Sequence, residues 1–247
     1  MKLKDLSRLA LLAALVTTGA ALRTHAQNKK TPRPEEQSVG AAGHAASSET
    51  KARAGATRYI YEFTNPAFFV TRIRLMHDST GRGRITFERK YTDGPITEPL
   101  TLSPAALQRI LTHWEALHFL DSNASYQHEK QFPHLGTVRL TMNDGARERT
   151  AEFNYSGDPD AFALATEYRR AADQAMIVFD INLALENQPL ESPKLLEQLD
   201  RMVARDAVSD AAQLTPLLRS LSTDERLPLI ARNRAAKILK KLEEDKK

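Results

Sequence analysis

The stretch His77–Arg89, HDSTGRGRITFER, holds residue types that serve catalysis and phosphate binding. A serine nucleophile needs a histidine base and an orienting carboxylate that are assembled in space. His77, Asp78 and Ser79 are instead adjacent in the sequence, and neighbouring residues of a strand point to opposite faces. Ser79 also lacks the G-x-S-x-G turn of serine hydrolases. We therefore predict no catalytic residues in this stretch.

The same stretch carries Gly81 and Gly83 in a G-x-G spacing that occurs in phosphate-binding loops. A third glycine is missing, and the residues that follow alternate like a strand instead of opening a helix. Without a helix N-terminus, an anion site loses its main backbone donors. The pattern favours the end of one strand and a turn over residues 77–83, where glycine supplies backbone freedom, and a return strand over residues 84–89.

Four histidines raise the question of a metal site. His113 and His118 are five residues apart, which places them on different faces of a helix. His128 and His134 fall in a polar loop with Glu129, and three loop ligands can gather around zinc. No HExxH pattern is present. We predict no metal and no cofactor, and keep an exported hydrolase or metal-dependent enzyme using the His113–His134 region as the alternative.

Three arginines form the candidate binding site. Arg72, Arg74 and Arg139 alternate with apolar residues, so we expect them on the solvent face of a sheet. An anionic polysaccharide, a lipid headgroup or an acidic partner would bind such a row. The alternative is a solvated face on which glutamates balance the arginines. The glutamates expected on this face are Glu88, Glu148 and Glu152.

Alternation of apolar and polar residues predicts the strands that would position these arginines. The expected strands cover residues 59–64, 68–75, 84–89, 96–102, 138–142 and 147–155. In the second strand, one face is expected to carry Phe69, Thr71, Ile73 and Leu75, and the other Val70, Arg72 and Arg74. Asp144-Gly145 predicts a tight hairpin between the last two strands.

Two helices are predicted from their capping residues. Ser103-Pro104 places a serine N-cap before a proline, and apolar residues then recur at helical spacing as far as residues 119–122. Asp158-Pro159 opens a second helix, which we expect to end near Asn187. This element order predicts an α+β domain over residues 58–188, an antiparallel sheet covered on one face by two helices.

This part of the chain resembles small exported bacterial domains of unknown function. The likeness covers residues 68–175 and rests on ITFERK, LTLSPAALQRILTHWEALHFLD and VRLTMNDG in this order. Some of those domains carry a cysteine pair near the first strands, whereas this chain has no cysteine. The resemblance implies an α+β fold and implies no activity.

The C-terminal part is expected to form a small all-helical subdomain over residues 189–247. Helices are predicted over residues 193–204, 207–221 and 227–244. Residues 213–244 resemble a single HEAT-type helical hairpin, with Leu227-Pro228 lengthening its turn. A solenoid needs about three repeats to bury a continuous core. The hairpin is therefore expected to pack on the α+β domain or on a partner protein.

The first residues have the three parts of a secretory signal peptide. Basic residues precede an apolar run over residues 9–22, and Thr24-His25-Ala26 supplies a cleavage site. The run is shorter than the roughly 20 residues that span a bilayer, so we expect cleavage over a retained anchor. Residues 1–26 are thus predicted to be a signal peptide. Residues 27–57 hold few large apolar side chains, which predicts a disordered linker, either a spacer or a tail without a role.

Charge and cysteine content narrow the function. The chain has 35 basic and 31 acidic residues, but residues 58–247 hold 26 basic and 27 acidic ones. A nucleic-acid binder concentrates basic residues on one face, so we predict no nucleic-acid partner and, after signal removal, no integral membrane span. The absence of cysteine excludes disulfides, thiolate metal sites and lipidation of a processed N-terminus. The sequence predicts an exported, periplasmic or secreted, non-catalytic binding module whose partner is an envelope protein contacting the C-terminal helices.

Overall fold

The computed structural model describes residues 57–244. The predicted signal peptide, the predicted linker up to residue 56 and the last three residues lie outside this range. Among residues 57–244, no helix combines the length and the apolar character needed to cross a membrane. The description below therefore concerns the predicted α+β domain and the predicted helical subdomain.

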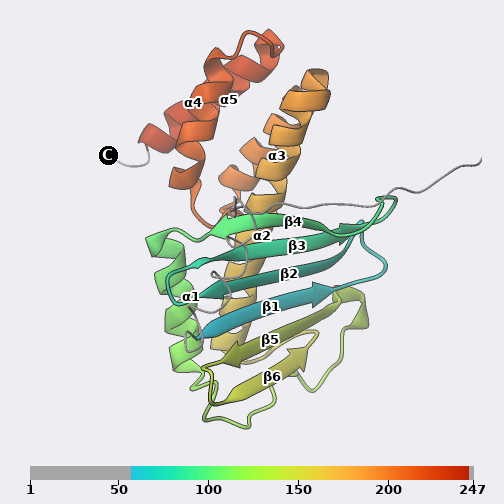
Figure 1. The fold of residues 1–247 in the computed structure, drawn as a ribbon, viewed down its shortest axis with the longest axis vertical. Coiled ribbons are helices and arrows are strands. Elements are labelled where there is room, and N and C mark those ends of the chain that lie inside the picture. The colour runs from blue at the N-terminus through green and yellow to red at the C-terminus, as the bar shows by residue number, and fades with distance from the viewer. Residues whose placement is uncertain (1–56, 245–247) are drawn as a thin grey trace, which may run out of the picture. The chain divides into compact units, whose positions relative to one another are not determined.

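The described residues form a six-stranded antiparallel sheet, which confirms the predicted fold class (Figure 1). The strand order is β4-β3-β2-β1-β5-β6. The strands are β1 (Arg58–Thr64), β2 (Val70–Asp78), β3 (Arg82–Arg89), β4 (Ile96–Thr101), β5 (Thr137–Asn143) and β6 (Glu148–Phe153). Hairpins join neighbours along the chain from β2 to β4 and from β5 to β6, as the alternating pattern predicts.

The inner face of the sheet is apolar because register aligns its large side chains across the strands. Ile85, Leu75, Tyr61 and Leu140 form one such row on four successive strands. Each of these side chains is at most 1% exposed. Cross-strand packing of this kind fixes the register, since a shift by one residue would turn the whole row towards solvent.

One part of the strand prediction was wrong. A register irregularity lies between Val70 and Arg72 on β2. Such a bulge inserts one extra residue and reverses the alternation beyond it. Val70 consequently packs against the core, whereas Phe69 is 59% exposed and does not share the buried face of Ile73.

Two helices cover the inner face, α1 (Pro104–Ala116) and α2 (Pro159–Asn187) (Figure 1). Both begin at the predicted caps. The Ser103 hydroxyl accepts a hydrogen bond from the Ala106 backbone N–H at 3.1 Å, and the Asp158 carboxylate accepts one from Ala161 at 2.9 Å. α1 ends a few residues before the predicted 119–122, where His118 takes a positive φ of 44°.

The C-terminal helices build a second apolar cluster. They are α3 (Ser192–Ala204), α4 (Thr215–Thr223) and α5 (Leu229–Glu244). α2 contributes Ile177 and Ile181 to this cluster, so the long helix belongs to both cores. The predicted helix start at Ala207 was wrong. The chain is irregular there because Asp210 caps a 3-10 turn (Ala211–Leu214) that leads into α4.

Candidate functional site

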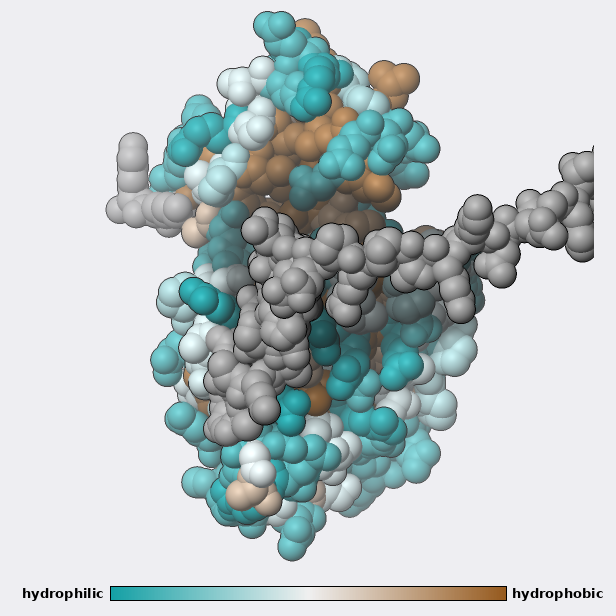
Figure 2. All heavy atoms as spheres, viewed as in Figure 1, coloured by the Kyte–Doolittle hydropathy of each residue, from teal (hydrophilic) through white to brown (hydrophobic). Residues whose placement is uncertain are grey.

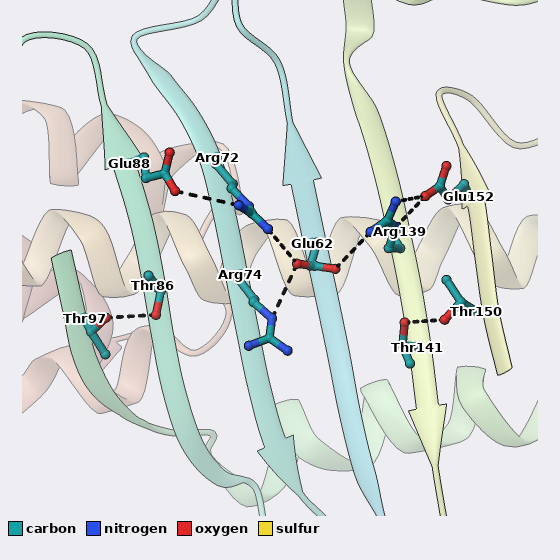
Figure 3. A network of polar contacts seen from close by, with 10 residues as sticks. All are labelled: Glu62, Arg72, Arg74, Thr86, Glu88, Thr97, Arg139, Thr141, Thr150 and Glu152. Carbon is teal, nitrogen blue, oxygen red and sulfur yellow. Dashed lines mark hydrogen bonds and ion pairs between the residues drawn. The ribbon is translucent and has the colours of Figure 1, made fainter. Parts of the chain in front are cut away.

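The structure brings Arg72, Arg74 and Arg139 together on the open face of the sheet (Figure 3). All three surround Glu62 on the central strand β1. The distances are 3.3 Å from Arg72 Nη2, 3.4 Å from Arg74 Nε and 3.9 Å from Arg139 Nη1 to the Glu62 carboxylate oxygens. Strand alternation explains the arrangement, since Glu62 lies between the buried Tyr61 and Phe63 and must point outward.

Two further glutamates complete this arginine–glutamate cluster. Glu88 lies 3.9 Å from Arg72, and Glu152 pairs with Arg139. Three arginines thus face three glutamates, so the formal charges of the cluster cancel. The arginine side chains are 40–50% exposed, and ion pairs at such positions contribute little to stability. The geometry favours the balanced, solvated face over an anion-binding site.

Glu148, the third glutamate expected here, lies at the edge of the cluster. Its carboxylate accepts a hydrogen bond from Asn143 Nδ2 at 2.6 Å and contacts none of the three arginines. Threonine pairs flank the arginine–glutamate cluster: Thr86 with Thr97 at 2.9 Å, and Thr141 with Thr150 at 2.8 Å (Figure 3). The open face is therefore polar and satisfied by its own cross-strand contacts.

The four candidate histidines are not brought together. His113 Nδ1 lies 2.9 Å from Asp160 Oδ1 at the start of α2, and His118 is exposed beyond α1. His128 accepts a hydrogen bond from the Lys130 backbone N–H, and His134 is exposed in a 3-10 turn. Within residues 57–244, no three histidine or carboxylate side chains are placed to hold a metal ion.

His77 proves to be part of the core. Its side chain is 1% exposed, with Nε2 at 2.8 Å from the Tyr168 hydroxyl and Nδ1 at 2.7 Å from the Asp78 carbonyl oxygen. Trp114 Nε1 donates to the same hydroxyl at 2.8 Å. A carbonyl oxygen can only accept, so His77 Nδ1–H donates to Asp78, and in the neutral imidazole Nε2 then accepts the Tyr168 proton. Burial lowers the pKa of His77, although the contacts with Asp78 oppose this. The neutral, buried His77 side chain therefore has a structural role in the core.

The glycines of the same stretch have different roles. Gly81 takes a φ of 77° in the turn, as predicted. Gly83 lies within β3, and an added Cβ would sit 1.8 Å from the Met76 carbonyl oxygen. Asp78 holds the turn by accepting hydrogen bonds from the Thr80 and Arg82 backbone N–H groups. The stretch is therefore a hairpin turn, as the sequence indicates.

A groove that the sequence does not reveal lies between the sheet edge and the helices. It has a volume of about 580 Å³ and is lined by β4, by α2 and by the segment that leads into α4. Its apolar lining includes Leu100, Val178, Phe179, Leu183 and Leu214. In Figure 2, hydrophobic surface gathers over the helices beyond β4, whereas the described surface of the sheet is mostly hydrophilic. We call this feature the β4–α2 groove.

The β4–α2 groove is acidic. Glu98 enters it from β4 and Glu186 from the end of α2, and no lysine, arginine or histidine lines it. Its formal charge is thus −2. The groove also contains an unsatisfied polar group: among the described residues the buried Ser209 hydroxyl has no hydrogen-bond partner. A buried hydroxyl without a partner lowers the stability of the fold.

Each wall of the groove follows from local sequence. β4 is an edge strand, and Pro99 suits an edge because it cannot donate to a neighbouring strand. Glu98 points inward beside it, an arrangement that discourages indiscriminate strand pairing. On α2, the residues after Phe179 extend beyond the sheet and present Leu183, which is 47% exposed. The edge position of β4 and the extension of α2 beyond the sheet depend on tertiary structure, so the sequence alone does not reveal the groove.

Comparison of the chain with protein-family models and with curated protein sequences finds no match.

Proposed function

We propose that the protein is an exported, non-catalytic binding module of the bacterial envelope. It binds a segment of a partner protein in the β4–α2 groove, and this segment carries basic and apolar side chains. The groove includes Ser209 and Leu214 from the C-terminal part. The predicted role of that part in partner binding is thus retained. Export rests on the N-terminal signal pattern.

The charge of the groove carries this proposal. Two glutamates stand over an apolar floor without a basic side chain among the lining residues. Complementary charge selects partners and speeds their association, while the apolar floor supplies the favourable burial. A segment that places a lysine or arginine near Glu98 and Glu186, with leucine-like side chains between them, matches both features.

The catalytic alternative receives less support. An exported hydrolase or metal-dependent enzyme would need the His113–His134 region to converge on a substrate. In residues 57–244 these histidines occupy separate surroundings, and His113 is engaged with Asp160. Turnover in a hydrolase screen with added zinc, lost in His128→Ala, would favour the enzyme and count against a purely binding role.

A charge-reversal experiment tests the proposal. The probes are two fluorescein-labelled peptides of equal length, one alternating lysine with leucine and one alternating glutamate with leucine. Fluorescence anisotropy should show preferential binding of the lysine peptide, weakened by salt. The double variant Glu98→Lys/Glu186→Lys should reverse this preference. The control variant Glu62→Lys/Glu152→Lys changes charge equally on the open sheet face and should retain the lysine preference.

Two results would overturn the groove as the binding site. One is equal binding of both peptides by the unaltered protein. The other is a lysine preference that survives the double reversal at Glu98 and Glu186. Ser209→Ala provides a further check: its unsatisfied hydroxyl is closed off from solvent, so the lysine preference should persist while the free energy of unfolding stays the same or rises.

A further inference from the structure

A second pocket, on the other side of α2 from β4, combines aromatic walls with paired charges. It has a volume of about 420 Å³ and lies between α2, the ends of β1, β5 and β6, and residues 205–207. Tyr61, Phe63 and Phe153 form its buried apolar part. Tyr155 and Phe162 line its exposed part. We call it the aromatic pocket.

The exposed aromatic side chains of this pocket are held in place by other rings. Tyr155 is 37% exposed, and its ring packs edge-on against Phe132, with centroids 5.2 Å apart, and against His128 at 5.4 Å. Phe162 is 52% exposed and meets Tyr155 at 6.1 Å. The rings therefore offer a preorganised apolar surface, which reduces the entropy cost of binding.

Polar groups reach the same pocket from α2. Arg169 Nε donates to both carboxylate oxygens of Asp173, at 3.1 and 3.2 Å, and its guanidinium lies 4.7 Å from the Phe63 ring centroid. Arg170 pairs with Asp206 at 2.8 Å. Each pair sets hydrogen-bond donors beside acceptors and carries no net charge. Arg205 adds one positive charge to the lining.

Aromatic rings beside neutral donor–acceptor pairs match the chemistry of a sugar ring. One face of a pyranose presents C–H groups, which pack on an aromatic ring. Its hydroxyls both donate and accept hydrogen bonds, so they can satisfy arginine and carboxylate groups together. We propose that the aromatic pocket binds a saccharide, stacked on Tyr155 and Phe162 and hydrogen-bonded to Arg169 and Asp173. This site is separate from the β4–α2 groove.

Saturation-transfer-difference NMR tests this proposal directly. The probes are maltotriose, cellotriose and triacetylchitotriose at millimolar concentration, with irradiation of the protein's aromatic protons. At least one trisaccharide should receive saturation on its ring C–H protons. Phe162→Ala should weaken its affinity roughly tenfold, because one stacking surface is lost. Asp173→Asn, which removes the charged acceptor, should weaken binding as well.

A control variant distinguishes a specific sugar site from nonspecific binding to exposed aromatic side chains. Phe69→Ala removes a comparably exposed phenylalanine outside the pocket, 59% exposed against 52% for Phe162, and should leave binding unchanged. Circular dichroism shows whether each variant is folded. The proposal is overturned if none of the three sugars receives saturation, if Phe162→Ala binds as tightly as the unaltered protein, or if Phe69→Ala weakens binding equally. Failure here leaves the lysine-peptide preference of the β4–α2 groove unaffected, so the two proposals are tested independently.

Discussion

Replacing Tyr168 by phenylalanine should lower the free energy of unfolding by more than the loss of a single oxygen atom suggests. The Tyr168 hydroxyl joins two elements of the core, since it accepts from Trp114 Nε1 on α1 and donates to His77 Nε2 on β2, both at 2.8 Å. Tyr168 and Trp114 are at most 1% exposed, as is His77. Water therefore cannot replace the missing hydroxyl without entering the core.

The expected loss follows from counting the groups left without a partner. Tyr168→Phe leaves one buried donor, the indole N–H, and one buried acceptor, the imidazole Nε2. Each of the two unsatisfied groups costs about 1–3 kcal/mol, so the free energy of unfolding should fall by roughly 2–6 kcal/mol. Tyr59→Phe is the matched control. Tyr59 stacks on His77 with ring centroids 5.1 Å apart, but its side chain is only half-buried.

Urea unfolding followed by circular dichroism and Trp114 fluorescence measures both variants. We expect Tyr59→Phe to lie within about 0.5 kcal/mol of the unaltered protein, because the half-buried position of Tyr59 lets water reach the groups around it. Tyr168→Phe should lower the urea midpoint with an unchanged m-value. If the two variants have equal free energies of unfolding, the hydroxyl does not hold the helix to the sheet and this description of the core is wrong.

Three further predictions concern the sheet. Burial lowers the pKa of His77 below its ordinary 6.5, so only the unfolded chain takes up this proton as pH falls below 6.5. The free energy of unfolding should then decrease by up to about 1.4 kcal/mol for each pH unit below 6.5. Urea titrations at several pH values should show a smaller decrease for His77→Gln. An equal decrease in both proteins would contradict this role of His77. Gly83→Ala, whose Cβ would collide with the Met76 carbonyl, should cost about 3 kcal/mol by thermal unfolding. Gly157→Ala should cost less, because its added Cβ would meet only the His128 side chain, at 3.2 Å. Glu62→Gln should cost about 1 kcal/mol or less and raise the salt needed to elute the protein from heparin; unchanged elution would show that Glu62 does not neutralise the arginines.

Much of the fold could be predicted from local sequence because local rules decide it. Alternation predicted the strand that holds Tyr61 and Phe63, and the caps Ser103 and Asp158 predicted the starts of both helices. The bulge before Arg72 could not be predicted, since it depends on pairing with β3. Likewise, the helix expected from Ala207 is absent there, because Asp210 caps a 3-10 turn that starts at Ala211.

The arginine–glutamate cluster was predicted in part. Alternation correctly placed Arg72, Arg74 and Arg139 on one face, and the same rule applied to Glu62 would have placed their common partner among them. Cross-strand neighbours, however, depend on a strand order that periodicity leaves open. His77 was missed as a core residue because its partner Tyr168 lies 91 positions away.

The β4–α2 groove and the aromatic pocket lay beyond sequence reasoning for a related reason. Glu98 and Glu186 are far apart in the chain, and nothing in their immediate neighbours pairs them. Both line one groove because α2 continues past the sheet and β4 lies at the sheet edge. The acidic lining of the groove and the unsatisfied Ser209 hydroxyl can be recognised only in the packed structure.

The most direct test of groove binding is to map the lysine–leucine peptide by NMR. Backbone amide shifts would be followed in the isotope-labelled protein during titration. The proposed function predicts the largest changes at Glu98–Leu102, at the α2 residues from Gln174 to Glu186 and at Ser209–Leu214, which line the groove. Changes centred instead on Glu62, Arg72 and Arg139 would place binding on the open sheet face and contradict the central claim.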